Sequence, residues 1–255
     1  MNLKPKVGFY EFTGCAGDLL TIVHSEDYLL DVLKSIEVCS FRLASSQKKE
    51  TNSPLDIAFV EGSITTTEQE EKLKELRAKS KILVALGTCA AFGGVQAMYS
   101  GKGSFLKRFR SVYDKGFKIV QAFESKPLDA FVKVDYFIPG CPISARLFLF
   151  NLPRLLANLP VELPNYPVCV ECKWRENECL LLQDIPCLGP VTRGGCEARC
   201  PKDNLPCVGC FGPVPGGNVL SWEKNLLEKK WTASQLEKKM RFFFGTKIKE
   251  VKRRK

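Results

Sequence analysis

The chain has 255 residues, of which 45% are hydrophobic, and a formal net charge of +10 at neutral pH. This length accommodates one ordinary hydrophobic core and a small second domain, and the hydrophobic content is typical of a soluble globular protein. The sequence contains no run of eighteen apolar residues, and its start, MNLKPKVGFYEF, lacks the apolar segment of a signal peptide. We therefore expect a cytoplasmic protein without a transmembrane segment.

Most of the positive charge lies near the C-terminal end. Residues Glu223 to Lys255 contain 12 Lys and Arg but only 4 Asp and Glu, which gives +8 of the total +10. A basic stretch can contact nucleic acid or an acidic partner, although it more often forms the solvated face of a helix. Its aromatic run, Phe242 to Phe244, indicates a packing or docking face.

The N-terminal part alternates between predicted strands and predicted helices. The predicted strands are Val7–Phe12, Ile36–Phe41, Leu55–Val60, Lys81–Leu86 and Val134–Ile138. The predicted helices are Leu19–Ser35, Thr65–Ser80 with Thr66 or Thr67 as its cap, and Pro142–Leu159, kinked or interrupted at Pro153. Residues 45–54 form a predicted loop, and the pattern of residues 101–126 assigns no element. The alternation predicts an α/β fold with a doubly wound, mostly parallel sheet.

Three cysteines follow predicted strands of this sheet. Cys15 comes after the first strand, Cys89 after the strand that ends at Leu86, and Cys141 after the strand that ends at Ile138. The carboxyl ends of parallel strands meet at one edge, so the fold would bring these cysteines together. Buried free cysteines are the alternative, but three at strand ends favour a metal site. Cys39 lies inside a strand and is expected to be a core residue.

The other eight cysteines lie close together in the second half of the chain. They are Cys169, Cys172, Cys179, Cys187, Cys196, Cys200, Cys207 and Cys210. The Pro and Gly residues between them predict irregular structure without an apolar core of its own, so a group bound to sulfur would hold this stretch together. A disulfide framework is disfavoured because nothing indicates export. Two zinc sites and two iron–sulfur clusters remain possible, and the single cysteines in Pro/Gly turns favour the clusters.

The order of these motifs resembles the small subunit of NiFe hydrogenases. The resemblance covers roughly residues 6–217, and it is nearest to the cytoplasmic proteins related to sulfhydrogenase and to methanogen hydrogenases. The motifs that carry it are GCAGD (14–18), VEGS (60–63), GTCA (87–90), PGCP (139–142) and CLGPVTRGGC (187–196). It implies a flavodoxin-like domain at residues 1–165, an irregular iron–sulfur domain at 166–222, and a basic C-terminal helix or tail at 223–255.

The resemblance also implies three 4Fe-4S clusters and assigns their ligands. The proximal group comprises Cys15, Asp18, Cys89 and Cys141. The medial group comprises Cys196, Cys200, Cys207 and Cys210. The distal group comprises Cys169, Cys172, Cys179 and Cys187. Such a subunit carries no catalytic residue and relays electrons between the NiFe centre of a separate large subunit and an iron–sulfur or flavoprotein partner. The expected assembly is a hetero-oligomer, with no nucleic acid as partner and no transmembrane segment.

The proximal motif departs from the family pattern, Cys-x-Gly-Cys, because the chain has Cys15-Ala16-Gly17-Asp18. We expect a carboxylate oxygen of Asp18 to ligate the fourth iron. A hard oxygen ligand differs from a thiolate in donor strength and would move the reduction potential. In the alternative, Asp18 caps the following helix, and water or Glu61 completes the cluster.

Two other functions are consistent with these residues. The first is an electron-transfer subunit of a related non-hydrogenase or energy-converting complex, because the ligands of the nickel lie on another chain. The second is a zinc-dependent basic binding module, for which nucleic acid is a candidate ligand. Iron and acid-labile sulfide in the purified protein would separate the cluster-containing functions from the zinc module.

Overall fold

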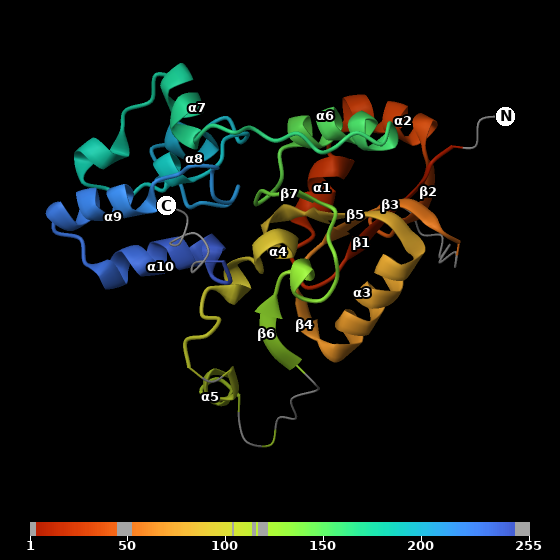
Figure 1. Cartoon of the computed structure of the whole chain (residues 1–255), viewed down its shortest axis with the longest axis horizontal. Coiled ribbons are helices and arrows are strands. Elements are labelled where there is room, and N and C mark those ends of the chain that lie inside the picture. Colours follow the sequence, from red (N-terminus) through yellow and green to blue (C-terminus); the bar gives the residue numbers. More distant parts are fainter. Residues whose placement is uncertain (1–3, 45–52, 104, 114–115, 117–121, 248–255) are drawn as a thin grey trace.

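The computed structural model describes residues 4–44, 53–103, 105–113, 116 and 122–247. Five strands form one parallel sheet in the order β2-β1-β3-β5-β7 (Figure 1). They are β1 (Lys6–Glu11), β2 (Glu37–Phe41), β3 (Leu55–Glu61), β5 (Ser80–Leu86) and β7 (Tyr136–Ile138). This is the flavodoxin-like order, in which the strand order reverses between β1 and β3. The predicted doubly wound α/β sheet is confirmed.

The two central strands explain why the sheet is buried on both faces. Phe59 of β3 and Val84 of β5 belong to the core on one face, whereas Val60 and Ala85 belong to the core on the other face. All four side chains are fully buried. Nearly continuous apolar strands are what a parallel sheet requires when helices cover both of its sides.

Helices from distant parts of the chain cover the two faces. On one face lie α1 (Gly17–Val23), α2 (Glu26–Ser35) and α6 (Ala145–Leu156), and the ring of Phe148 meets that of Phe59 edge-on with centroids 5.2 Å apart. On the other face, α3 (Thr67–Lys79) buries Leu73 and Leu76 against the sheet (Figure 1). Helices α1 and α4 (Gly87–Phe92) begin soon after β1 and β5 end, at the carboxyl edge of the sheet.

Several predicted elements differ in detail. The predicted helix Leu19–Ser35 is two helices, because the backbone of Ser25 leaves the helical region (φ −84°, ψ 50°). The predicted Thr66 cap is confirmed, since its hydroxyl accepts a hydrogen bond from the Gln69 amide at 3.2 Å. Helix α6 continues past Pro153 without interruption. Most of the predicted loop at 45–54 lies outside the described residues.

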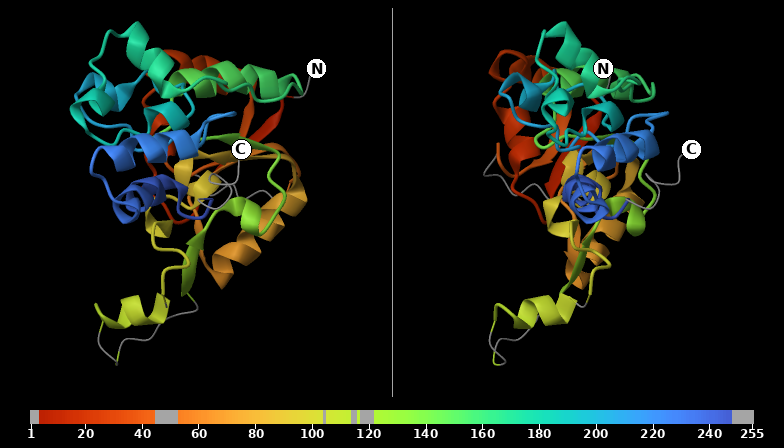
Figure 2. Two further views of the ribbon diagram at one scale, coloured as in Figure 1. Left: turned by 60° about the vertical axis from the view of Figure 1, so that its left-hand side comes forward. Right: turned by 90° about the vertical axis from the view of Figure 1, so that its left-hand side faces the viewer.

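Some elements were not predicted at all. They are β4 (Ile64–Thr66), α4 (Gly87–Phe92), α5 (Phe105–Arg110), β6 (Ala122–Lys126) and the 3-10 turns η1 (Val95–Ala97) and η2 (Leu128–Ala130). Strands β4 and β6 form a separate antiparallel pair. Helix α5 projects away from the rest of the molecule (Figure 2).

The second half of the chain has an apolar core, which the cysteine-rich stretch shares with the two helices that follow it. Helices α9 (Val219–Glu228) and α10 (Ala233–Phe244) bury Leu226 and Met240 against Val168, Leu188 and Val191 of the cysteine-rich stretch. The reason is that amphipathic helices after Cys210 supply the apolar face that the Pro/Gly-rich turns lack. The remaining elements are α7 (Val168–Trp174), α8 (Arg199–Lys202), η3 (Leu180–Gln183) and η4 (Gly189–Val191).

The C-terminal helices account for the aromatic run noted in the sequence. Phe243 and Phe244 are buried in this core, while Phe242 is partly exposed. Residues 248–255, the end of the basic stretch, lie outside the described residues. Within the described ranges, no helix has both the length and the apolar character needed to cross a bilayer.

Candidate metal centres

The structure brings the proximal cysteines together at the carboxyl edge of the sheet. Cys15, Cys89 and Cys141 lie in or beside the loops that follow β1, β5 and β7. Burial, together with the charges of Asp18, Cys141 and Cys15, raises the pKa of the Cys89 thiol to about 12. Burial and the charges of Asp18, Cys15 and Glu61 raise the pKa of Cys141 to about 11. The three sulfurs and the Asp18 carboxylate therefore share one site.

Asp18 lies in the first turn of α1, but its side chain does not cap that helix. The N-cap residue is Ala16, in a left-handed conformation with φ 60°. Asp18 Oδ1 instead accepts a hydrogen bond of 2.8 Å from the Ile143 amide, two residues beyond Cys141. Its Oδ2 faces Gly87, where a Cβ atom would lie only 1.7 Å away. The loop after β5 thus needs a glycine to leave room for this carboxylate.

The environment of Asp18 disfavours the ionised form of its carboxyl group when no cation is bound. The residue is 5% exposed. Burial and the neighbouring Glu61 raise its pKa to about 7, although the bond from Ile143 acts in the opposite direction. A bound cation would favour the ionised carboxylate, because an opposite charge offsets the loss of solvation.

Glu61, rather than Asp18, is the side chain that accepts a hydrogen bond from the backbone at the start of α1. Its Oε2 accepts a hydrogen bond of 2.8 Å from the Leu19 amide, and the amides of Ala16 and Asp18 also bind this carboxylate. Burial nevertheless raises the pKa of Glu61. A helix begins with amides that have no partner within the helix, and Glu61 is the acceptor for them here.

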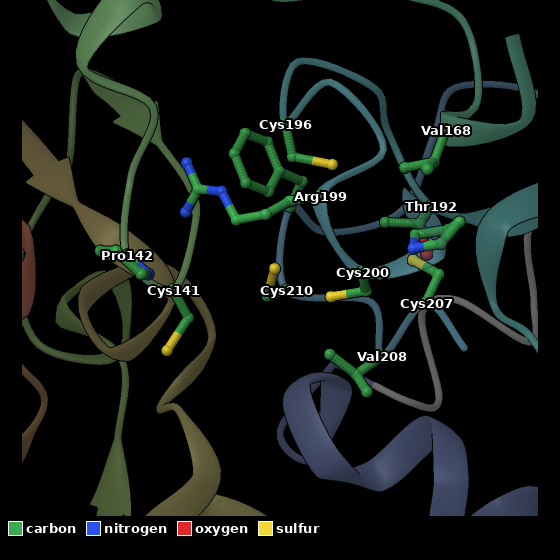
Figure 3. Close-up of a pocket in the computed structure, with 12 residues that line it drawn as sticks. Cys141, Pro142, Val168, Thr192, Cys196, Arg199, Cys200, Cys207, Val208 and Cys210 are labelled. Atoms are coloured by element: carbon green, nitrogen blue, oxygen red, sulfur yellow. The ribbon is translucent and has the colours of Figure 1, made fainter. Parts of the chain in front are cut away.

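The medial cysteines line a single cavity. Cys196, Cys200, Cys207 and Cys210 surround it together with Val168 and Thr192, and their sulfurs lie around its centre (Figure 3). Burial, together with the charges of Cys196 and Cys200, raises the pKa of Cys210 to about 12. Cys141 of the proximal group also lines this cavity, on its opposite side.

The distal cysteines line a second cavity. Cys169, Cys172, Cys179 and Cys187 surround it. Burial, together with the charges of the other three cysteines, Cys187 most, raises the pKa of Cys169 to about 12. Gly189 lets the chain pass close to the sulfurs, because a Cβ atom there would lie 3.2 Å from Cys169 Sγ and 3.5 Å from Cys187 Sγ.

Direct contacts join the three groups end to end. Cys141, in the proximal group, lines the same cavity as Cys210 in the medial group. The amide of Cys207, in the medial group, donates to the sulfur of Cys187 in the distal group at 3.2 Å. Thr88, next to Cys89, is buried and bonds through its hydroxyl to the carbonyl of Cys210 at 2.6 Å. The order along the molecule is proximal, medial, distal.

The residues of these sites fit iron–sulfur clusters. All twelve cysteines, each of which lies in the described ranges, are free thiols. In the described part of the chain, no three His, Cys, Asp or Glu side chains converge as the ligands of one ion would; the medial and distal sulfurs each line a cavity instead. Four thiolates around a shared space are the donor set of a cubane cluster.

Sequence reasoning missed two residues that organise the sites. Thr88 lies inside the GTCA motif, in which the adjacent Cys89 is the expected ligand. Glu171 lies between Cys169 and Cys172 and is 5% exposed. A carboxylate between the two cysteines of a Cys-x-x-Cys pair can be noticed in the sequence. Only the fold shows that the side chain of Glu171 points into the protein.

Comparisons with known proteins agree with this architecture. Residues 15–153 match the family described as NADH ubiquinone oxidoreductase, 20 Kd subunit. The chain is 40% identical over 215 residues to sulfhydrogenase 2 subunit delta of Pyrococcus furiosus, covering 84% of this chain and 89% of that protein. It is 34% identical over 244 residues to a subunit of the vhu F420-non-reducing hydrogenase of Methanocaldococcus jannaschii, covering 83% of each.

A solved structure shares the fold. The chain superposes on a reduced, active Ni-Fe-Se hydrogenase from Desulfomicrobium baculatum with a TM-score of 0.56 and 21% identity, covering 82% of this chain and 95% of that one. Fold and sequence together define the class. The chain belongs to the family of the 20 kDa NADH ubiquinone oxidoreductase subunit, and within it to the small subunits of hydrogenases, as the sequence motifs predicted.

Proposed function

We propose that this chain is the electron-conducting subunit of a NiFe hydrogenase. It relays electrons between the NiFe centre of a large subunit and an iron–sulfur or flavoprotein partner. Three bound 4Fe-4S clusters would supply one-electron redox chemistry. The chain itself contributes their spacing, their burial and the hydrogen bonds to their sulfurs, and these set the reduction potentials.

The end-to-end contact of the three cysteine groups carries this proposal. Cys141 lines the same cavity as Cys210, and the Thr88 hydroxyl, next to Cys89, bonds to the Cys210 carbonyl at 2.6 Å. The Cys207 amide donates to the Cys187 sulfur at 3.2 Å. Each group is thus adjacent to the next. A row of three redox centres is the arrangement that electron transfer across a subunit needs, whereas independent structural metal sites have no need of it.

The buried thiols support iron at these positions. Cys169 and Cys210 both have pKa values raised to about 12, chiefly by burial. At neutral pH such cysteines would hold their protons in the absence of a metal, and metal binding would release them. Free thiols also suit a reducing compartment, which supports the cytoplasm as the proposed location.

We also propose that Asp18 completes the proximal cluster. The carboxylate lies among Cys15, Cys89 and Cys141, as its effect on the Cys89 and Cys141 thiols indicates. Glu61 is the weaker candidate, because the first amides of α1 already bind its carboxylate. Oxygen ligation would give the proximal cluster a potential different from that of an all-thiolate cluster.

The assignment of ligands is tested by counting iron and acid-labile sulfide in the anaerobically purified protein. Replacing one ligand of the medial group (Cys200→Ser) or of the distal group (Cys169→Ser) should remove the spectroscopic signal of that cluster and about four iron atoms. Cys39→Ser is the matched control, because Cys39 is buried in β2, away from all three groups. Full folding with zinc and no iron would refute the proposal.

The role of Asp18 is tested by EPR and redox titration of Asp18→Cys and Asp18→Asn. The cysteine variant should retain the proximal cluster with a changed signal and potential. The asparagine variant should lose one ligand and show a labile proximal cluster. An unchanged proximal signal and potential in both variants would exclude ligation by Asp18.

A related complex other than a hydrogenase is the second candidate function. The family match to an NADH ubiquinone oxidoreductase subunit favours it, because such a subunit would also conduct electrons. Metal analysis of the purified complex separates the two: nickel in the partner subunit, together with hydrogen oxidation, supports the hydrogenase, and iron without nickel supports the alternative.

A further inference from the structure

One buried carboxylate joins the distal and medial groups. Glu171 lies in α7 between the distal residues Cys169 and Cys172, yet its side chain turns toward the loop of the medial residue Cys196. Oε1 accepts a hydrogen bond of 2.5 Å from the Gly195 amide, and Oε2 accepts one of 3.2 Å from the Ala198 amide. The carboxylate therefore binds the backbone on both sides of Cys196.

The backbone conformation of this loop directs its amides inward. Glu197 and Ala198 both adopt left-handed conformations, with φ values of 57° and 52°. The amides of Gly195 and Ala198, on either side of this turn, both donate to the Glu171 carboxylate. Without Glu171, the amides of Gly195 and Ala198 would lose their acceptor, and the position of Cys196 would no longer be fixed.

The carboxylate also lies close to the sulfur. Glu171 Oε2 is 3.9 Å from Cys196 Sγ, and the Tyr166 hydroxyl approaches Oε1 at 3.5 Å. The neighbouring arginines, Arg146 and Arg175, bind Glu197 instead. The negative charge of Glu171 is therefore held by amides and a phenol, beside a ligand of the medial cluster.

We propose that Glu171 is a positioning residue that fixes the Cys196 loop and lowers the reduction potential of the medial cluster. This inference rests on the proposed function. An all-thiolate cluster is anionic, and each electron that it accepts adds negative charge. A buried carboxylate nearby opposes that addition, because electrostatic interactions are weakly screened away from water.

The test is an EPR-monitored redox titration of the full chain, purified without oxygen in complex with its large subunit. Glu171→Gln removes the charge and keeps the shape, so the medial potential should move to more positive values, by more than the distal potential. Glu197→Gln is the matched control. It removes a carboxylate from the same loop that is half-exposed and paired with two arginines, and it should leave the medial potential nearly unchanged.

Each possible result of this titration either supports or overturns the inference. A fully loaded Glu171→Gln protein with an unshifted medial potential, or a shift equal to that of Glu197→Gln, would overturn it. Should Glu171→Gln fail to load the medial cluster, Glu171→Asp is titrated instead. It keeps the charge but withdraws it from Cys196, so a smaller positive shift is expected, and an unchanged potential would overturn the inference. A wild-type protein without a medial signal would instead refute the proposed function itself.

Discussion

The hydroxyl of Thr88 lies 2.6 Å from the carbonyl oxygen of Cys210 and 2.7 Å from that of Gly140. Thr88 is next to Cys89, and Gly140 is next to Cys141. A single buried side chain therefore connects the loops that carry two proximal cysteines with the loop that carries the last medial cysteine. The separation of the first two cluster sites depends on this contact.

Replacing Thr88 with valine should weaken this junction. The shape is kept, but the Cys210 carbonyl loses a hydrogen bond in a buried position, which costs about 1–3 kcal/mol. For a chain of this size, we expect the midpoint of thermal unfolding at a fixed scan rate to fall by about 2–4 °C per kcal/mol. Thr88→Ser keeps the hydroxyl and should behave like the wild type. Equal midpoints for the valine and serine variants would contradict the prediction.

A methyl group at position 87 should displace the Asp18 carboxylate. Gly87 has φ +80°, and a Cβ atom there would lie 1.7 Å from Asp18 Oδ2. We expect Gly87→Ala to lose the proximal cluster, seen as a missing EPR signal and about four fewer iron atoms. Gly216→Ala separates this clash from backbone strain, because Gly216 has φ +71° with open space around it. Both variants carry the backbone cost of about 1–2 kcal/mol, but only Gly87→Ala should lose iron.

The indole of Trp222 anchors the C-terminal core to the distal site. Its N–H donates to the Cys187 carbonyl at 2.8 Å in a buried position. Trp222→Phe should leave this carbonyl without its donor, at a cost of about 1–3 kcal/mol, and shorten the lifetime of the distal cluster in air. Trp231→Phe is the control, because Trp231 makes the same kind of bond to the Asp184 carbonyl at an exposed site. Equal cluster lifetimes in the two variants would show that the anchor does not matter.

The ion pair of Arg77 and Asp135 should stabilise the sheet domain near neutral pH, and this contribution should be lost in acid. Burial acts to raise the pKa of Asp135, but the bond from the Leu83 amide and the contact with Arg77 outweigh it, so the pKa is lowered. A depressed pKa contributes stability above the unfolded value of 3.8, and that contribution disappears as the pH falls through the lower folded value. Asp135→Asn should therefore lower the free energy of unfolding by about 1–3 kcal/mol near neutral pH, with the difference shrinking below about pH 4.

Urea unfolding of the wild type and Asp135→Asn across this pH range measures that difference. Any loss of a bound cofactor in acid affects both proteins alike, so their comparison isolates the pair. Glu68→Gln is the control, because Glu68 and Lys72 form an exposed pair on α3, which contributes little to stability. A difference between wild type and Asp135→Asn that does not change with pH would contradict the linkage.

The sequence predicted the sheet and the meeting of three cysteines at its edge, because both depend on a short-range pattern. Apolar runs such as Leu55–Val60 identify parallel strands without knowledge of their neighbours. Once the strands are parallel, Cys15, Cys89 and Cys141 lie at the same edge, however far apart they are in sequence.

Other features depend on contacts that no local pattern contains. The acceptor for the first amides of α1 is Glu61, from another strand, and this leaves Asp18 to bind Ile143. The inward orientation of Glu171 depends on the turn at 195–198. The break at Ser25 inside an otherwise helical pattern and the apolar core of the second half, completed by residues after Cys210, are likewise tertiary outcomes.

The place of α10 in that core ties the cysteine-rich stretch to a helix well beyond it in the sequence. Leu236, Met240 and Phe244 of α10 share an apolar core with Cys187 and Cys207. Loosening α10 would therefore open the apolar surroundings of one distal cysteine and one medial cysteine at the same time.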